Sequence, residues 1–186
     1  MAEEQTITVF TSLEIPTQLV DSMITMQQGR DEMEPQHRDA IHLTLAFLGR
    51  LDAEKLADAA AFLSGKTWTA PLIRFTGQVR HGSWALKSDP DYHYDEATIQ
   101  KGEQIRLGIE PVPELLGIYS DLTRNLGGAE DDYWPHVTLG VARRNVPAAS
   151  MNTLDIPRQG GPARSLDLRQ ESEEAHHRVL VTRDFS

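Results

Sequence analysis

One short motif occurs twice in the sequence, and its residue types are those of acid–base chemistry. The two copies are His42-Leu43-Thr44-Leu45 and His136-Val137-Thr138-Leu139. The composition predicts only roughly 0.06 matches to His-x-Thr-Leu by chance. Residues i and i+2 of a strand point to the same face, about 6.6 Å apart along the chain. Each copy, if it lies in a strand, therefore presents an imidazole beside a hydroxyl, and two neighbouring strands would bring four polar groups together.

Two imidazoles and two hydroxyls suit the hydrolysis of a phosphodiester. One histidine can activate water and the other can protonate the leaving oxygen, since an ordinary imidazole titrates near pH ~6.5. The threonine hydroxyls can donate hydrogen bonds to phosphate oxygens. This chemistry needs no metal and no cofactor. A zinc site is the main alternative, but neither strand places a carboxylate beside its histidine.

The composition excludes several classes of protein. The chain has 186 residues, of which 39% are hydrophobic and 25% are charged, as in an ordinary globular domain. It contains no cysteine, which excludes disulfides, thiolate catalysis and cysteine-ligated metal sites. The acidic start at residues 1–5 has no apolar signal region, and no apolar stretch is long enough to span a membrane. We expect a cytoplasmic protein that does not associate with membranes.

The net charge of −10 restricts how the protein could handle nucleic acid. Proteins that grip long duplexes by their phosphates carry a basic face. An acidic chain is better suited to hold an RNA end or a small nucleotide in a local pocket. Charge alone favours an ordinary acidic soluble protein, and we expect a monomer.

The elements that must position the two motifs follow from periodicity and from turn residues. Helices are predicted at residues 17–28, 53–63 and 113–126, with Asp52 as an N-cap and Gly127 as a stop. Strands are predicted at residues 6–13, 41–48, 72–79, 84–87, 134–142, 165–169 and 178–182, with a turn at residues 81–82. Several strands follow one another as hairpins, so we expect an α+β fold with antiparallel pairing.

Residues 88–111 are acidic and match neither a clear strand nor a strong helix. A weak helical periodicity begins after Asp95. We interpret this stretch as an insertion or flap within a single domain that spans residues 1–186.

Four short segments resemble the 2H phosphoesterase superfamily. Residues 42–49 (HLTLAFLG) and 136–140 (HVTLG) match its paired motifs. Residues 10–16 (FTSLEIP) are similar to the first strand of its bacterial RNA 2′,3′-cyclic phosphodiesterase branch, long called 2′-5′ RNA ligase. Residues 133–136 (YWPH) resemble that branch's aromatic-x-Pro-His entry to the second motif. The order of elements fits from Thr6 to Phe185.

The resemblance implies two pseudo-symmetric lobes, each an antiparallel sheet flanked by helices, around a central cleft. It implies metal-independent opening of a 2′,3′-cyclic phosphate, on an RNA end or a small nucleotide, to a 2′-phosphate. His42 would be the proton donor to the 3′ oxygen and His136 the proton acceptor from water. Thr44 and Thr138 would bind the phosphate.

Other residues are candidates for substrate binding. Phe10 and Tyr133 could stack on a base. The branch often has an arginine five residues after the second histidine, where this chain has Val141, so Arg143 is the nearest candidate for that role. We expect His176 and His177 to lie on the surface.

Two other functions remain open at this point. The same site could ligate or cleave 2′-5′-linked oligonucleotides. The chain could also be a nucleotide-binding module that has kept the histidines without turnover. Incubation with nucleoside 2′,3′-cyclic phosphates separates the module from the enzyme.

Overall fold

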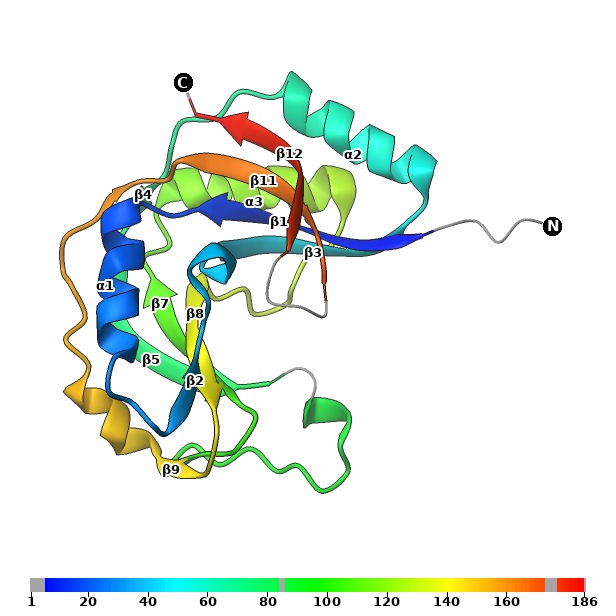
Figure 1. The fold of residues 1–186 in the computed structure, drawn as a ribbon. Helices are drawn as coiled ribbons and strands as arrows, with labels where there is room; N and C mark the ends of the chain where they lie inside the picture. The colour runs from blue at the N-terminus through cyan, green and yellow to red at the C-terminus, as the bar shows by residue number, and fades with distance from the viewer. Residues whose placement is uncertain (1–5, 84–85, 173–176, 186) are drawn as a thin grey trace.

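The computed structural model describes residues 6–83, 86–172 and 177–185, and Figure 1 shows their arrangement. The three α-helices are α1 (Thr17–Gln27), α2 (Ala53–Gly65) and α3 (Pro113–Leu126). The short 3-10 helices are η1 (Arg38–Ala40), η2 (Leu86–Ser88) and η3 (Ala148–Thr153). The long strands are β1 (Ile7–Glu14), β3 (Leu43–Leu51), β5 (Phe75–Gly82), β7 (Gln104–Ile109), β8 (His136–Ala142), β11 (Ser165–Gln170) and β12 (Arg178–Asp184). The short strands are β2 (Met33–Pro35), β4 (Leu72–Ile73), β6 (Thr98–Ile99), β9 (Val146–Pro147) and β10 (Gly161–Pro162).

The main sheet has eight strands, and every pairing within it is antiparallel. Its order is β12-β11-β1-β3-β8-β7-β5, and β2 also pairs with β8. The short strands form two further pairs, β10 with β4 and β6 with β9. The predicted α+β architecture with antiparallel pairing is confirmed, as is the hairpin formed by β11 and β12.

The main sheet consists of two halves that join at a single residue pair. Leu43 of β3 is opposite Val137 of β8, and no other register pair connects these strands within the described residues. In Figure 1 the strands β1, β3, β11 and β12 run across the upper part of the molecule, whereas β8, β7 and β5 run down from the join. The two histidine motifs therefore lie at the point where the halves meet.

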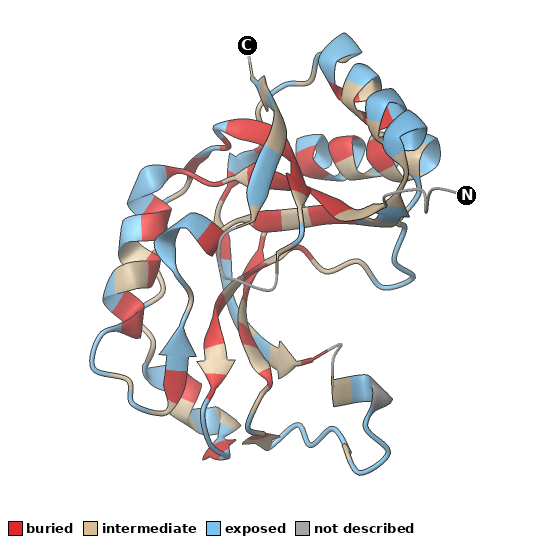
Figure 2. Cartoon of the chain, turned by 45° about the vertical axis from the view of Figure 1, so that its right-hand side comes forward, coloured by how far each residue is buried: buried red, intermediate tan, exposed pale blue. Residues whose placement is uncertain are grey.

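Apolar side chains hold the two halves against the helices. In β3 and β8 the residues Leu43, Leu45, Val137 and Leu139 are almost completely buried. Figure 2 shows buried segments along these strands and on parts of the helices. A slip of one residue in either strand would turn its leucines to the other face and its histidine into the core. The core thus fixes the direction in which the motifs point.

Local sequence signals set the helix ends. Asp52 caps α2 by accepting a hydrogen bond from the backbone N–H of Lys55 at 2.8 Å. Pro113 occupies the first turn of α3, where its missing N–H costs nothing. Gly127 ends α3 with φ of 88°, a conformation that favours glycine. The predicted N-termini of all three helices are confirmed. None of the described helices is long and apolar enough to span a bilayer.

The region from residue 72 to residue 111 differs from the prediction. The expected strand at residues 72–79 is divided into β4 and β5, and the expected turn at residues 81–82 is the end of β5. Leu86 and Lys87 belong to η2 rather than to a strand, and residues 84–85 lie outside the described residues.

The helical periodicity expected after Asp95 is wrong. Residues 104–109 form β7, an internal strand of the main sheet, so this part of the segment is neither a flap nor an insertion outside the sheet. The reason is that Ile105, Leu107 and Ile109 alternate with other residues and are all buried. The described residues between β5 and β7 lie outside the main sheet, and β6 among them pairs with β9.

Candidate active site

The four motif residues share one face of the sheet. Because Leu43 and Val137 are opposite each other in an antiparallel pair, His42 comes next to Thr138, and Thr44 comes next to His136. Leu43 and Val137 are fully buried, so their neighbours in sequence point to the other face. We call this surface, made by His42, Thr44, His136 and Thr138, the His–Thr face. No hydrogen bond joins either threonine hydroxyl to another of the described side chains.

A backbone carbonyl fixes the orientation of His136. The carbonyl of Trp134 lies 2.7 Å from Nδ1 of His136 and can only accept a hydrogen bond, so Nδ1 carries the proton. In the neutral ring, Nε2 is then a free base. The Trp134 ring also stacks on the imidazole with centroids 5.5 Å apart. A glycine is needed at position 108, opposite His136, because a Cβ there would lie 2.7 Å from the Trp134 ring.

His42 is surrounded by other rings and by a cation. Its ring stacks on Phe10 with centroids 5.2 Å apart, and His177 approaches its edge with centroids 5.6 Å apart. Its Nδ1 is buried and makes no hydrogen bond within the described chain. These contacts place His42 in a drier environment than a surface histidine.

Burial lowers the pKa of both motif histidines. The pKa of His42 falls to about 3, first because of desolvation and then because of the charge of Arg169, while the Ala40 carbonyl acts in the opposite direction. The pKa of His136 falls to about 4, first through desolvation, while the Trp134 carbonyl raises it and Arg106 lowers it further. Both rings are therefore neutral at pH 7 in the free protein.

Two arginines lie in a row with Thr138 across the lower half of the sheet. Arg106 of β7 is the register partner of Thr138, and Arg80 of β5 is the partner of Arg106. The Arg80 guanidinium lies over the Trp134 ring at 4.2 Å from its centroid. Sequence reasoning missed both residues. The signal for Arg106 was available, since the buried alternation around it directs its side chain to the opposite face.

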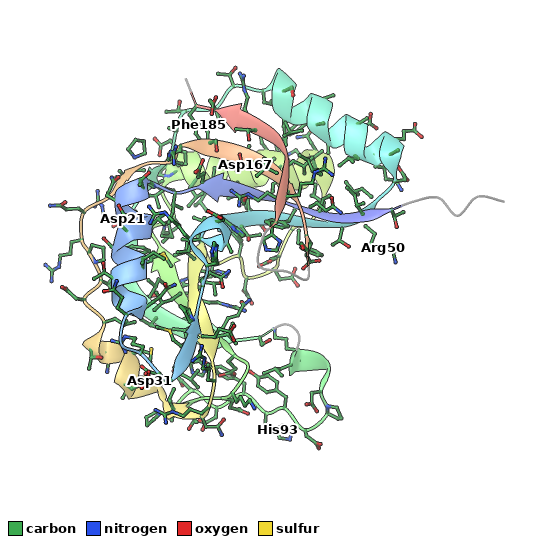
Figure 3. The ribbon with its side chains drawn as sticks, in the orientation of Figure 1. Asp21, Asp31, Arg50, His93, Asp167 and Phe185 are labelled. Carbon is green, nitrogen blue, oxygen red and sulfur yellow. The ribbon has the colours of Figure 1, made fainter. Side chains whose placement is uncertain are left out.

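A third arginine serves the half that carries His42. Arg169 of β11 is buried and donates a hydrogen bond to the Asp167 carboxylate at 2.8 Å. Figure 3 labels Asp167 among the upper strands. The Nε of Arg169 and the Oγ of Ser12 are buried without partners, like Nδ1 of His42. Unpaired buried polar atoms of this kind are unusual in a folded core, and each calls for an explanation such as a catalytic role or a bound water or ion.

Phe10 and Tyr133, the two aromatic candidates for substrate binding, both lie next to motif residues. Phe10 lies against His42 but is only 4% exposed, so it supports the His42 ring and leaves no open face for a base. Tyr133 stacks on Tyr119 with centroids 3.8 Å apart and donates a hydrogen bond to the Thr44 carbonyl at 3.2 Å, so it buttresses the strand that carries Thr44.

Arg143 is not brought to the histidines. It follows the end of β8, seven positions after His136, or about 23 Å along an extended chain. Arg106 and Arg80 provide the positive charge near His136 instead. His177 is half-buried just before β12, and its ring contacts both Phe10 and His42, a neighbourhood that the sequence did not predict. His176 lies outside the described residues.

Solved structures of other proteins share the whole fold. LigT of Escherichia coli in its apo form matches with a TM-score of 0.69 and 19% identity, covering 98% of this chain and 99% of that one. A protein described as a phosphoesterase gives 0.67 and 19%, covering 97% and 99%. Usb1 of Kluyveromyces marxianus gives 0.53 and 13%, covering both chains completely. LigT has also been solved with ATP, with NADP+, with 3′-AMP and with phosphate.

Sequence comparison alone finds nothing of this kind: no family model and no curated protein sequence matches the chain. The match to solved structures is therefore a likeness of fold. It agrees with the resemblance to the 2H phosphoesterases that the two motifs indicate, and it confirms that resemblance at the level of the architecture.

Proposed function

We propose that this protein is a phosphodiesterase that opens a terminal 2′,3′-cyclic phosphate to a 2′-phosphate, without a metal or another cofactor. The observation that carries the proposal is the His–Thr face, on which two imidazoles and two hydroxyls meet across the single Leu43–Val137 pair. This arrangement offers a base, an acid and two donors for phosphate oxygens at one place.

The reaction uses the two histidines on opposite sides of the phosphorus. Nε2 of neutral His136 takes a proton from water, and the water oxygen forms a bond to phosphorus. The bond between phosphorus and the 3′ oxygen breaks, and His42 gives its proton to that oxygen, which leaves a 2′-phosphate. Thr44 and Thr138 donate hydrogen bonds to the non-bridging oxygens, on which negative charge increases. The resemblance to the 2H phosphoesterases supports this division of roles.

The electrostatics of the free site fit the base better than the acid. The lowered pKa of His136 keeps it neutral and ready to accept a proton at pH 7. His42 is neutral as well and must be protonated before it can act. An anionic phosphate placed beside it opposes desolvation and Arg169, so substrate binding raises the pKa of His42. Substrate binding thus favours the protonated form of His42 that the reaction requires.

A terminal nucleotide fits the half that carries His42. Arg169 offers an unpaired Nε–H to the phosphate, and Phe10, which is only 4% exposed, supports the His42 ring instead of stacking on the base. The positive charge of Arg169 is a local exception in a chain with a net charge of −10. The site is therefore suited to one end of an RNA or to a small cyclic nucleotide rather than to a long duplex.

The first test is turnover of nucleoside 2′,3′-cyclic phosphates followed by phosphorus NMR. We expect a 2′-phosphate product, at a rate that exhaustive EDTA treatment leaves unchanged. No group of three or more His, Asp or Glu side chains in the described part of the chain is placed to hold a metal ion. Tight binding without product would instead favour the binding module. A 3′-phosphate product would reverse the roles of the histidines, and activity restored by zinc after EDTA would refute the metal-free mechanism.

The threonine hydroxyls should contribute less than the histidines. We expect Thr44→Val and Thr138→Val each to lower kcat/KM by about 10- to 100-fold, because each removes a hydrogen bond to a charged oxygen. Valine keeps the volume and the strand preference. Thr25→Val is the matched control, since Thr25 is exposed on α1 and bonds only to its own helix, and it should leave kcat/KM unchanged. Equal activity of all three variants would remove the threonines from the phosphate site.

A further inference from the structure

A pocket of about 590 Å³ lies beside the His136 half of the site, and the proposed reaction does not use it. Its wall includes His81 at the end of β5, Arg106 of β7 and the aromatic side chains of Tyr92 and Tyr94. The tyrosines belong to the excursion between β5 and β7, which stands away from the main sheet in Figure 3, where His93 is labelled. The pocket thus lies between this excursion and the sheet.

A buried carboxylate attaches the excursion to the sheet. Glu103 is completely buried and accepts a hydrogen bond from Nδ1 of His81 at 2.7 Å. It also accepts from the backbone N–H of Gln100 at 2.8 Å and from the Tyr92 hydroxyl. A buried charge with this many partners holds its neighbours in one arrangement. The pocket wall is therefore formed before a ligand arrives.

The pocket offers an aromatic surface to a ligand. The Tyr94 ring stacks on the His81 ring with centroids 5.1 Å apart, and 58% of Tyr94 is exposed. Such an exposed aromatic side chain, backed by a fixed ring, is a platform for a planar base. Because it is exposed, the Tyr94 ring is not part of the core.

Positive charge connects the pocket to the reacting phosphate. Arg106 lines the pocket and is also the register partner of Thr138 on the His–Thr face. Arg80 extends the row by one more strand. Neighbouring strands are about 4.8 Å apart, so the row from Thr138 to Arg80 spans roughly 10 Å. It provides a basic path away from the site in an acidic protein.

We propose that this pocket is a subsite for the penultimate nucleotide of an RNA that ends in a cyclic phosphate. Tyr94 stacks on its base, and Arg106 binds the phosphate that joins it to the terminal nucleotide. The cyclic phosphate occupies the 3′ end, so the penultimate nucleotide is the only neighbour in the strand. This inference rests on the proposed function and narrows its substrate from small cyclic nucleotides to RNA ends.

The test compares kcat/KM for a nucleoside 2′,3′-cyclic phosphate with that for a dinucleotide carrying the same terminal group. For the wild-type protein we expect a preference for the dinucleotide of about 5- to 150-fold, the range measured for stacking of one base on an aromatic ring. Tyr94→Ala should abolish most of this preference, and Tyr94→Phe, which keeps the ring, should retain it. The preference should also fall with added salt, because the dinucleotide contributes one more phosphate.

Each result separates the subsite from the proposed reaction. Turnover of both substrates at equal efficiency by the wild-type protein would overturn the subsite and leave the reaction intact. An equal loss on both substrates in Tyr94→Ala would also overturn it. If neither substrate is turned over, the proposed function fails, and the subsite is judged by equilibrium binding alone. It then stands only if the dinucleotide binds more tightly to the wild-type protein than to Tyr94→Ala.

Discussion

Replacement of either motif histidine by alanine is expected to lower kcat/KM on a 2′,3′-cyclic phosphate by about 10²- to 10⁴-fold. Each change removes one of the two proton transfers, from water to His136 or from His42 to the 3′ oxygen. The reaction needs both transfers. The double variant His42→Ala with His136→Ala should therefore lose far less than the product of the two single losses. Steady-state kinetics on the three variants provide the measurement.

Folding of the variants is a necessary control for this result. Both side chains lie on the His–Thr face, and the core contacts of β3 and β8 are made by Leu43 and Val137 instead. Circular dichroism and thermal unfolding should consequently show folded proteins. A folded single variant with a rate near that of the wild type would show that the two-histidine mechanism is wrong.

The pH dependence should differ clearly from that of two ordinary histidines. The pH profile of kcat/KM reports the free enzyme, in which the pKa of His42 is about 3 and that of His136 is about 4. The reaction needs His42 protonated while His136 is neutral, and with these pKa values that form is a minor species whose population is largest below pH 5. Above that pH, kcat/KM should fall roughly tenfold per pH unit.

The profile of kcat should have its optimum at higher pH. It reports the complex with substrate, in which the phosphate anion favours a protonated histidine. A kcat/KM profile that instead peaks near pH ~6.5, the ordinary range of histidine, would show that the pKa values of these two rings are not lowered by burial.

The same two groups restrict the pH range of that experiment. Their pKa values are lower in the folded protein than the usual histidine value of 6.5, so the unfolded chain binds more protons below that pH. Stability is therefore complete above about pH 6.5 and falls as the pH decreases toward 4. Denaturant unfolding at each pH should show this loss, and His42→Ala should reduce it. Activity is interpreted only where the unfolding curve shows a folded protein.

The sequence alone determined the parts of this protein that depend on local periodicity. A strand repeats every two residues, so His-x-Thr places its two polar groups on one face whatever the rest of the chain does. Alternation predicted the strand β1, and the N-cap Asp52 and the first-turn proline Pro113 set the starts of α2 and α3. The fold class followed from the succession of strands. The prediction failed at β7, where a weak helical pattern was favoured over an alternation of only six residues.

The tertiary structure decided which distant residues complete the site. The single Leu43–Val137 pair puts the two motifs on one face, and the strand order then brings Arg106 to Thr138 and Arg169 to Phe10. No local pattern carries this information, because the partners come from strands that are far apart in the sequence. The lowered pKa values likewise arise from burial by neighbouring elements, which residue types alone do not reveal. The repeated His-x-Thr-Leu motif is enough to predict acid–base groups. The charges around its histidines, and the pocket beside them, form only when the strands pair.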